Sequence, residues 1–159
     1  MNIRWAALST LTLALTVAGL FTAIAAVPQQ QPDRSLVYHD HPPDAPLPDT
    51  LDPETFRENR TAFASYTLAS RIKEVLYQVP CYCPCGEKEG HHSLLDCYTS
   101  KHGVTCRICQ KEAVFSYLEH KDGKTPAQIR KAMADGEAMR LDLDKEIDRF
   151  YTESPAAKK

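Results

Sequence analysis

The feature that most constrains this chain is the confinement of all its cysteines to one short segment. No cysteine precedes Cys81 or follows Cys109 in the sequence of 159 residues. Cysteines this close together can ligate a soft metal ion jointly or pair as disulfides. We therefore expect them to act together, whichever chemistry they serve. The six residues are Cys81, Cys83, Cys85, Cys97, Cys106 and Cys109.

The overall composition is that of an ordinary soluble domain. Hydrophobic residues make up 43% of the chain and charged residues 25%, values typical of globular proteins. The formal net charge is −2, and aromatic residues are not interleaved with clusters of lysine or arginine. These features argue against a nucleic-acid partner.

Residues 1–26 have the features of a signal peptide or a signal anchor. Arg4 is followed by an apolar stretch from Trp5 to Val27, and Ala23-Ile24-Ala25 matches the small-residue cleavage pattern. Left uncleaved, the stretch is long enough to serve as an N-terminal membrane anchor across a bilayer core of about 30 Å. Both outcomes predict an extracytoplasmic protein that is periplasmic, secreted or membrane-tethered.

Three further segments follow in the predicted domain organisation. Residues 27–50 are rich in proline, which favours extended conformations and removes backbone donors, so they are expected to form a linker. Residues 51–152 are expected to form a helical Cys/His-rich domain. Residues 153–159 complete the chain as a tail.

The domain begins with a predicted helix. Asp52 is a capping acid, and Pro53 suits the first helical position. Apolar residues then recur at spacings compatible with one helical face. Pro80 disfavours helical geometry at the residue before it, so the helix is expected to end near Gln78.

Two later segments also carry helix signals. One helix is expected to begin at Thr105 and to end before Asp122. The next begins with a capping box at Thr125, with Pro126 in the first helical position. Gly136 is expected to end or bend that helix, and apolar residues continue at helical spacing to Phe150. The predicted fold is mainly α, with an irregular Cys/His-rich loop between helices.

The cysteine segment has two groups of soft donors. Pro84 favours extended angles at Cys83, and an extended Cys81–Cys85 stretch would direct alternate side chains to one side. Cys106 and Cys109 are three residues apart at a predicted helix start, so they share one face. The positive end of the helix favours their thiolates.

Residues 70–135 resemble the bacterial family named for its PCYCGC motif, many of whose members are extracytoplasmic lipoproteins. The resemblance rests on Pro80 to Gly86, Gly90 to Tyr98 and His102 to Cys109. Pro84 replaces the glycine of the motif, which stiffens the loop. No lipobox cysteine follows the apolar stretch, so the lipoprotein anchor is not carried over. The resemblance implies the motif and the location rather than an activity.

The preferred hypothesis is an extracytoplasmic protein that binds copper or zinc for capture, delivery or sequestration. Thiolates and imidazoles are the donors that these soft ions select. The implied partners are the metal ion and a metal-handling or membrane protein. The predicted ligands are Cys81, Cys83, Cys85, Cys106 and Cys109, with Cys97, His91, His92 and His102 as further candidates.

Two alternatives remain open from the sequence. Three disulfides could staple a small exported structural or interaction domain, because an even cysteine count in an oxidising compartment favours bridges. Alternatively, Cys106 and Cys109 could serve as the redox pair of a thiol–disulfide oxidoreductase. Such enzymes place strands beside the pair, and the sequence predicts none there. No other constellation of catalytic residues stands out, so an enzyme is not favoured.

Overall fold

The computed structural model describes residues 36–84 and 88–154. The signal segment, the start of the linker, Cys85 and the end of the tail lie outside the described residues. The described residues belong to one compact unit that begins at Arg34. Among them, no helix is both long and apolar enough to cross a membrane.

The prediction of a mainly helical fold is confirmed, since all regular secondary structure in the described part of the chain is helical. A Cys/His-rich region lies between helices, as expected. In chain order the helices are η1 (Pro53–Phe56), α1 (Arg60–Ala69), α2 (Lys73–Tyr77), α4 (Asp96–Thr99), α5 (His102–Thr105), α6 (Arg107–Lys121), α7 (Pro126–Ala134), α8 (Glu137–Arg140) and α9 (Leu143–Glu153).

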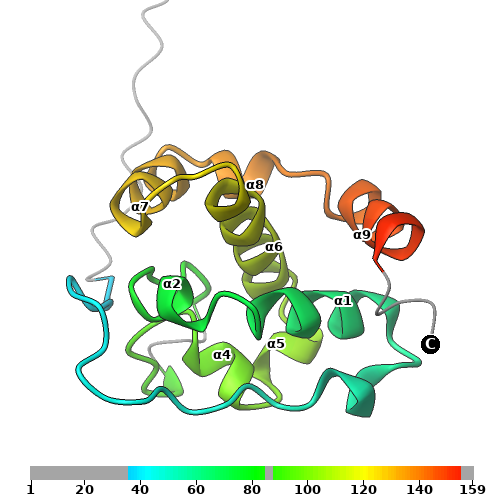
Figure 1. The fold of residues 1–159 in the computed structure, drawn as a ribbon, viewed down its shortest axis with the longest axis horizontal. Helices are drawn as coiled ribbons and strands as arrows, with labels where there is room; N and C mark the ends of the chain where they lie inside the picture. Colours follow the sequence, from blue (N-terminus) through cyan, green and yellow to red (C-terminus); the bar gives the residue numbers. More distant parts are fainter. Residues whose placement is uncertain (1–35, 85–87, 155–159) are drawn as a thin grey trace, which may run out of the picture. The chain divides into compact units, whose positions relative to one another are not determined.

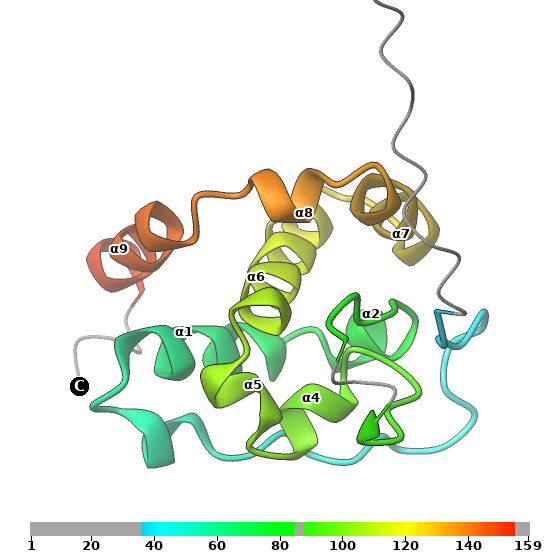
Figure 2. The same cartoon turned by 180° about the vertical axis from the view of Figure 1, so that it is seen from behind.

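Helix α6 is the element around which the others pack (Figure 1). It contacts α1, α2, α5, α7, α8 and α9. The same arrangement seen from behind places α4 and α5 near the start of α6 (Figure 2), and Lys111 in the first half of α6 donates its Nζ–H to the carbonyl of Met139 in α8 at 2.8 Å. Residues at the start of α6 therefore have neighbours from both halves of the domain, because Arg107 also forms an ion pair with Asp144 in α9 at 2.7 Å.

The prediction of a single helix between Asp52 and Gln78 is wrong, because the chain forms the three separate helices η1, α1 and α2 there. Asp52 does cap the start, since its side chain accepts from the backbone N–H of Glu54. However, the chain is extended at Asn59, whose side chain caps a new helix by accepting from the N–H of Ala62. Asparagine competes with helix continuation in this way because its side chain replaces a backbone acceptor.

The signals around α7 are confirmed. Thr125 and Gln128 form the reciprocal capping box, and the helix stops before Gly136, which has a φ of 79°. Glycine adopts this left-handed conformation without steric cost. The helical pattern that continues beyond Gly136 is divided in two, because Asp142 is extended and its side chain caps α9.

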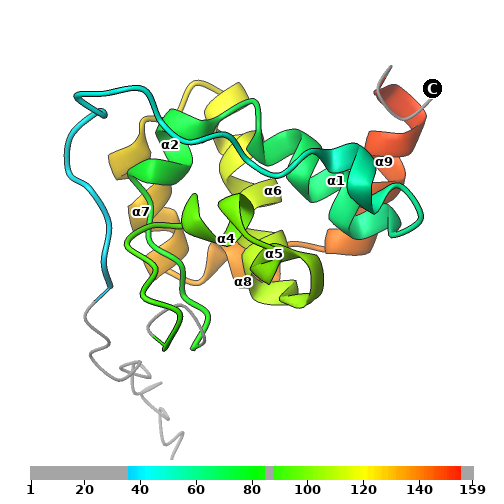
Figure 3. The same cartoon turned by 90° about the horizontal axis from the view of Figure 1, so that it is seen from below.

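Residues 36–52, which include the end of the predicted linker, run along the outside of the helices (Figure 3). Leu51 donates its N–H to the carbonyl of Tyr98 at 2.8 Å. Asp49 forms an ion pair with Lys73 at 2.7 Å. The ring of His39 stacks on Tyr77 at 3.8 Å. This part of the chain is therefore attached to the helical body by several kinds of contact.

Two clusters of buried side chains form the core. The larger one lies among α1, α2, α4, α6 and α7, and it contains Cys83, Cys97 and Cys109. The smaller one joins α1, α6 and α9 through residues such as Phe63 and Phe150. These three cysteines are thus part of the main core.

Gly103 in α5 is a close-packed position. A Cβ at this residue would lie 3.1 Å from the carbonyl oxygen of Cys97 and 3.2 Å from the Tyr66 hydroxyl. The Gly103→Ala variant should therefore lose about 1–2 kcal/mol of unfolding free energy, because overpacking outweighs the helix propensity gained. Urea unfolding of the reduced protein measures this change. Exposed Lys101→Ala is the neighbouring control, and a Gly103→Ala variant as stable as wild type would contradict the packing.

Candidate metal centre

Helix α6 supplies two of the sulfurs. Cys106 occupies the N-cap position of the helix, and Cys109 lies on its first turn. This confirms the prediction that the pair stands at a helix start. Cys109 has an exposed fraction of 0%, whereas Cys106 is half-buried. One sulfur therefore belongs to the core and the other lies nearer the surface.

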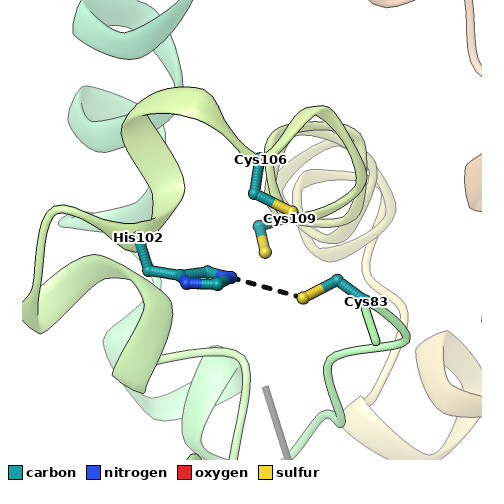
Figure 4. A group of neighbouring side chains, drawn as sticks. All are labelled: Cys83, His102, Cys106 and Cys109. Carbon is teal, nitrogen blue, oxygen red and sulfur yellow. Dashed lines mark hydrogen bonds between the residues drawn. The ribbon is translucent and has the colours of Figure 1, made fainter. Parts of the chain in front are cut away.

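Two other elements complete a group of four donors (Figure 4). His102 comes from α5, and Cys83 comes from the segment after α2. The Cys83 Sγ lies 3.3 Å from the His102 Nε2. All four donor atoms, including those of Cys106 and Cys109, lie within 4.8 Å of one another. We call these four residues the first group.

A second group consists of Cys81, Cys97 and Cys109, whose sulfurs also lie within 4.8 Å of one another. The Cys109 Sγ is 3.4 Å from that of Cys81 and 3.5 Å from that of Cys97. The Cys97 Sγ is in turn 3.3 Å from His91 Nδ1. Cys109 is therefore common to both groups.

The five described cysteines are free thiols. The Cys109 Sγ lies 3.4 and 3.5 Å from two other sulfurs, and both separations far exceed a disulfide bond of about 2.05 Å. The separations are instead close to the distance between two sulfur ligands of one metal ion. Tetrahedral zinc with Zn–S bonds of about 2.3 Å places its sulfurs roughly 3.7 Å apart. The cluster could thus bind a metal ion with little rearrangement.

The thiols shift one another's pKa values in opposite directions. Hydrogen bonding to Cys109 lowers the pKa of Cys106 to about 5. Hydrogen bonds with Cys109 and then Cys97 also lower the pKa of Cys81. The pKa of Cys109 is raised, because its proton is held by Cys106, Cys81 and Cys97 and its site is buried. The pKa of Cys97 is raised too, so Cys81 and Cys106 are the thiols that ionise most readily, and a metal cation would replace the protons that remain.

Buried polar contacts hold the ligand-bearing segments to α6. The carboxylate of Glu112 accepts the backbone N–H of Tyr82 at 2.9 Å, between the two cysteines of the PCYC segment. The amide of Gln110 donates to the carbonyls of Gly103 and Val104 in α5. The Tyr98 hydroxyl donates to the Cys109 carbonyl at 2.9 Å. Each contact fixes one element relative to α6.

The fold brings most of the predicted ligands together but leaves His92 apart from them. Among the described residues, Cys81, Cys83, Cys97, Cys106, Cys109, His91 and His102 lie in or beside the two groups. The ring of His92 is exposed, and its backbone N–H is bound by the Asp96 side chain. Cys85 lies outside the described residues. Cys81 and Cys83, expected to face one side, belong to different groups.

Glu112 and Gln110 hold ligand-bearing segments to α6, and neither was predicted from the sequence to have this role. Both are buried although their side chains are polar, with exposed fractions of 0% and 5%. A signal for Glu112 was present, because it lies three residues after Cys109 and so on the same helical face. Charged residues are rarely buried without a specific partner, and its partner at Tyr82 is distant in the sequence.

A family model described as "protein of unknown function with PCYCGC motif" matches residues 44–138. The chain belongs to this family, which confirms the resemblance found in the sequence. The match extends beyond the cysteine segment. It includes part of the segment 36–52 that runs along the outside of the helices, and the helices up to the start of α8. No curated protein and no solved structure matches the chain.

The buried carboxyl of Glu112 gives a pH-dependent prediction. Burial raises its pKa well above 4.5, and the nearby Cys81 raises it further. The folded state therefore keeps a proton that the unfolded state releases, so this residue's contribution to stability falls as pH rises above about 4.5.

Glutamine cannot ionise, so the Glu112→Gln variant avoids the loss of stability that follows ionisation of Glu112 at high pH. Its side-chain oxygen can still accept the backbone N–H of Tyr82. In the reduced, metal-free protein at pH 8, Glu112→Gln should raise the unfolding free energy by about 1–3 kcal/mol, and the gain should vanish near pH 4. Chemical denaturation across this pH range measures it, with Glu119→Gln on the same helix as control. A gain that is equal at both pH values would contradict the mechanism.

Proposed function

We propose that this protein is exported and binds a soft metal ion, copper or zinc, through its Cys/His cluster for capture, delivery or sequestration. The observation that carries the proposal is the convergence of four donor atoms from three separate elements within 4.8 Å. Three of these donors are sulfurs and one is an imidazole nitrogen. Free cysteines can fill a core as small apolar residues, but an imidazole nitrogen directed at three sulfurs adds a polar atom that an apolar core does not need.

The donor chemistry sets the class of ion. Three thiolates with one imidazole are an established tetrahedral zinc set, and thiolates also select Cu(I). Calcium and magnesium instead require oxygen ligands. The first group contains no oxygen donor, so hard cations are not its natural ligands.

The positions of the donors suit exchange with the surroundings. Cys106 and His102 are half-buried, while Cys83 and Cys109 are buried. An ion can therefore reach the first group from the side of Cys106 and His102 without unfolding of the core. A partner that removes or supplies metal would approach the same side.

Export is supported by the leader features of residues 1–26 rather than by the fold. In that location copper handling is a plausible need, and the thiols must be kept from oxidation. The disulfide-stapled alternative needs a movement of either neighbouring sulfur toward Cys109 from the observed separations of 3.4 and 3.5 Å. Oxidation in an oxidising compartment could join Cys109 to either neighbour.

The metal-binding proposal predicts a strong effect of single ligands. Loss of an outer-shell partner typically weakens metal binding 10- to 100-fold, so Cys83→Ser or His102→Ala should weaken Zn²⁺ or Cu(I) binding by at least about 100-fold. Competition titration of the reduced protein with a chromophoric chelator measures the affinity. Exposed His120→Ala is the matched control and should bind as wild type does.

Wild-type affinity in both Cys83→Ser and His102→Ala would refute the first group as a metal site. Native mass spectrometry of the exported protein, with and without thiol alkylation, then separates the alternatives. Bound metal with alkylatable thiols supports the proposal. Three disulfides with no bound metal would refute the proposal and support a structural domain held together by disulfides.

Export gives a separate prediction. Trp5 is the only tryptophan of the chain, so cleavage near Ala25 should yield a mature protein without indole fluorescence. Cell fractionation and intact mass of the protein expressed in bacteria test this outcome. An uncleaved anchor would keep Trp5 and remain in the membrane fraction, whereas full-length protein in the cytoplasm would contradict export.

A further inference from the structure

The first group leaves several donors of the cluster unused. Cys81 and Cys97 each contact Cys109 without belonging to the first group, and His91 contacts Cys97. We propose that the cluster binds two soft ions, with the Cys109 Sγ as a ligand shared by both. This inference rests on the proposed function, because it assigns a second ion of the same chemical class beside the first.

The separations within the second group support a distinct ion. The sulfurs of Cys81 and Cys97 lie 3.4 and 3.5 Å from the Cys109 Sγ. These values are close to the edge of roughly 3.7 Å expected for sulfurs around one tetrahedral ion. Three sulfurs so placed form one face of a coordination shell.

The number of donors matches two shells better than one. A single tetrahedral ion takes four donors, which the first group alone provides. Two tetrahedra that share one corner need seven donors, namely four and four with one in common. The described cluster offers seven: Cys81, Cys83, Cys97, Cys106, Cys109, His91 and His102.

The position of His91 suits the role of fourth ligand to the second ion. Its Nδ1 lies 3.3 Å from the Cys97 Sγ. Its ring meets that of His102 edge to face, with centroids 5.0 Å apart. The two imidazoles are thus neighbours, with one beside each group.

Charge balance permits a second divalent ion. One divalent ion held by the three thiolates of the first group leaves a net charge of −1, and a second divalent ion with the thiolates of Cys81 and Cys97 leaves the same net charge. Uncompensated charge is expensive in this core, where Cys97 and Cys109 have exposed fractions of 0%. The second ion therefore adds two thiolates to the cluster without adding uncompensated charge.

The test is a Zn²⁺ titration of the reduced full chain followed by native mass spectrometry. The wild type should saturate at two ions. Cys81→Ser alters only the second group and Cys83→Ser only the first, so each should saturate at one. His120→Ala, as control, should keep two. Far-UV circular dichroism of each variant should show the helical signal, so that lost ions are not due to unfolding.

Cadmium NMR tests the shared sulfur directly. The protein loaded with a spin-½ cadmium isotope should give two signals that are coupled to each other, because scalar coupling passes through a bridging thiolate. Two uncoupled signals would overturn the bridge. Saturation of the wild type at one ion, with Cys81→Ser binding equally well, would overturn the second site and leave the proposed function intact. Absence of any bound zinc or copper would overturn both.

Discussion

The burial of the Cys109 sulfur is the constraint on which the cluster depends. The residue lies on the first turn of α6, the helix that contacts most of the others. Cys81 and Cys97 approach it from separate segments, and the first group includes it as well. Because Cys83, Cys97 and Cys109 also belong to the main hydrophobic cluster, the donor cluster and the core are one structure. Metal binding is therefore expected to contribute directly to folding stability.

Local features of this fold were predictable because they depend on neighbouring residues. The capping box at Thr125 and the left-handed Gly136 are short-range devices whose side-chain chemistry is visible in the sequence. The same is true of Cys106 at a helix start. In each case the residue that gives the signal and the helix end that it marks lie within one helical turn.

Other features were not predictable because they depend on contacts between distant segments. The split of Cys81 and Cys83 into two groups requires the chain to turn at Cys83, where alternation along an extended strand no longer applies. Glu112 holds the backbone of Tyr82 between them across a separation of 30 residues. Helix breaks were missed for a related reason: apolar periodicity continues through Asn59, while the cap formed by its side chain starts a new helix.

A bound metal ion and a disulfide would compete for the same sulfur, that of Cys109. Any bridge from Cys109 to Cys81 or to Cys97 would take the one sulfur that both groups share. Oxidation at this position would therefore weaken both groups at once, whereas a bridge elsewhere in the cluster would affect fewer ligands. Conversely, a metal-bound thiolate is held by its ion and is less available to attack another sulfur. An ion acquired before exposure to oxidants would thus preserve the thiols, and the order of metal loading and oxidation would decide which form of the domain is present.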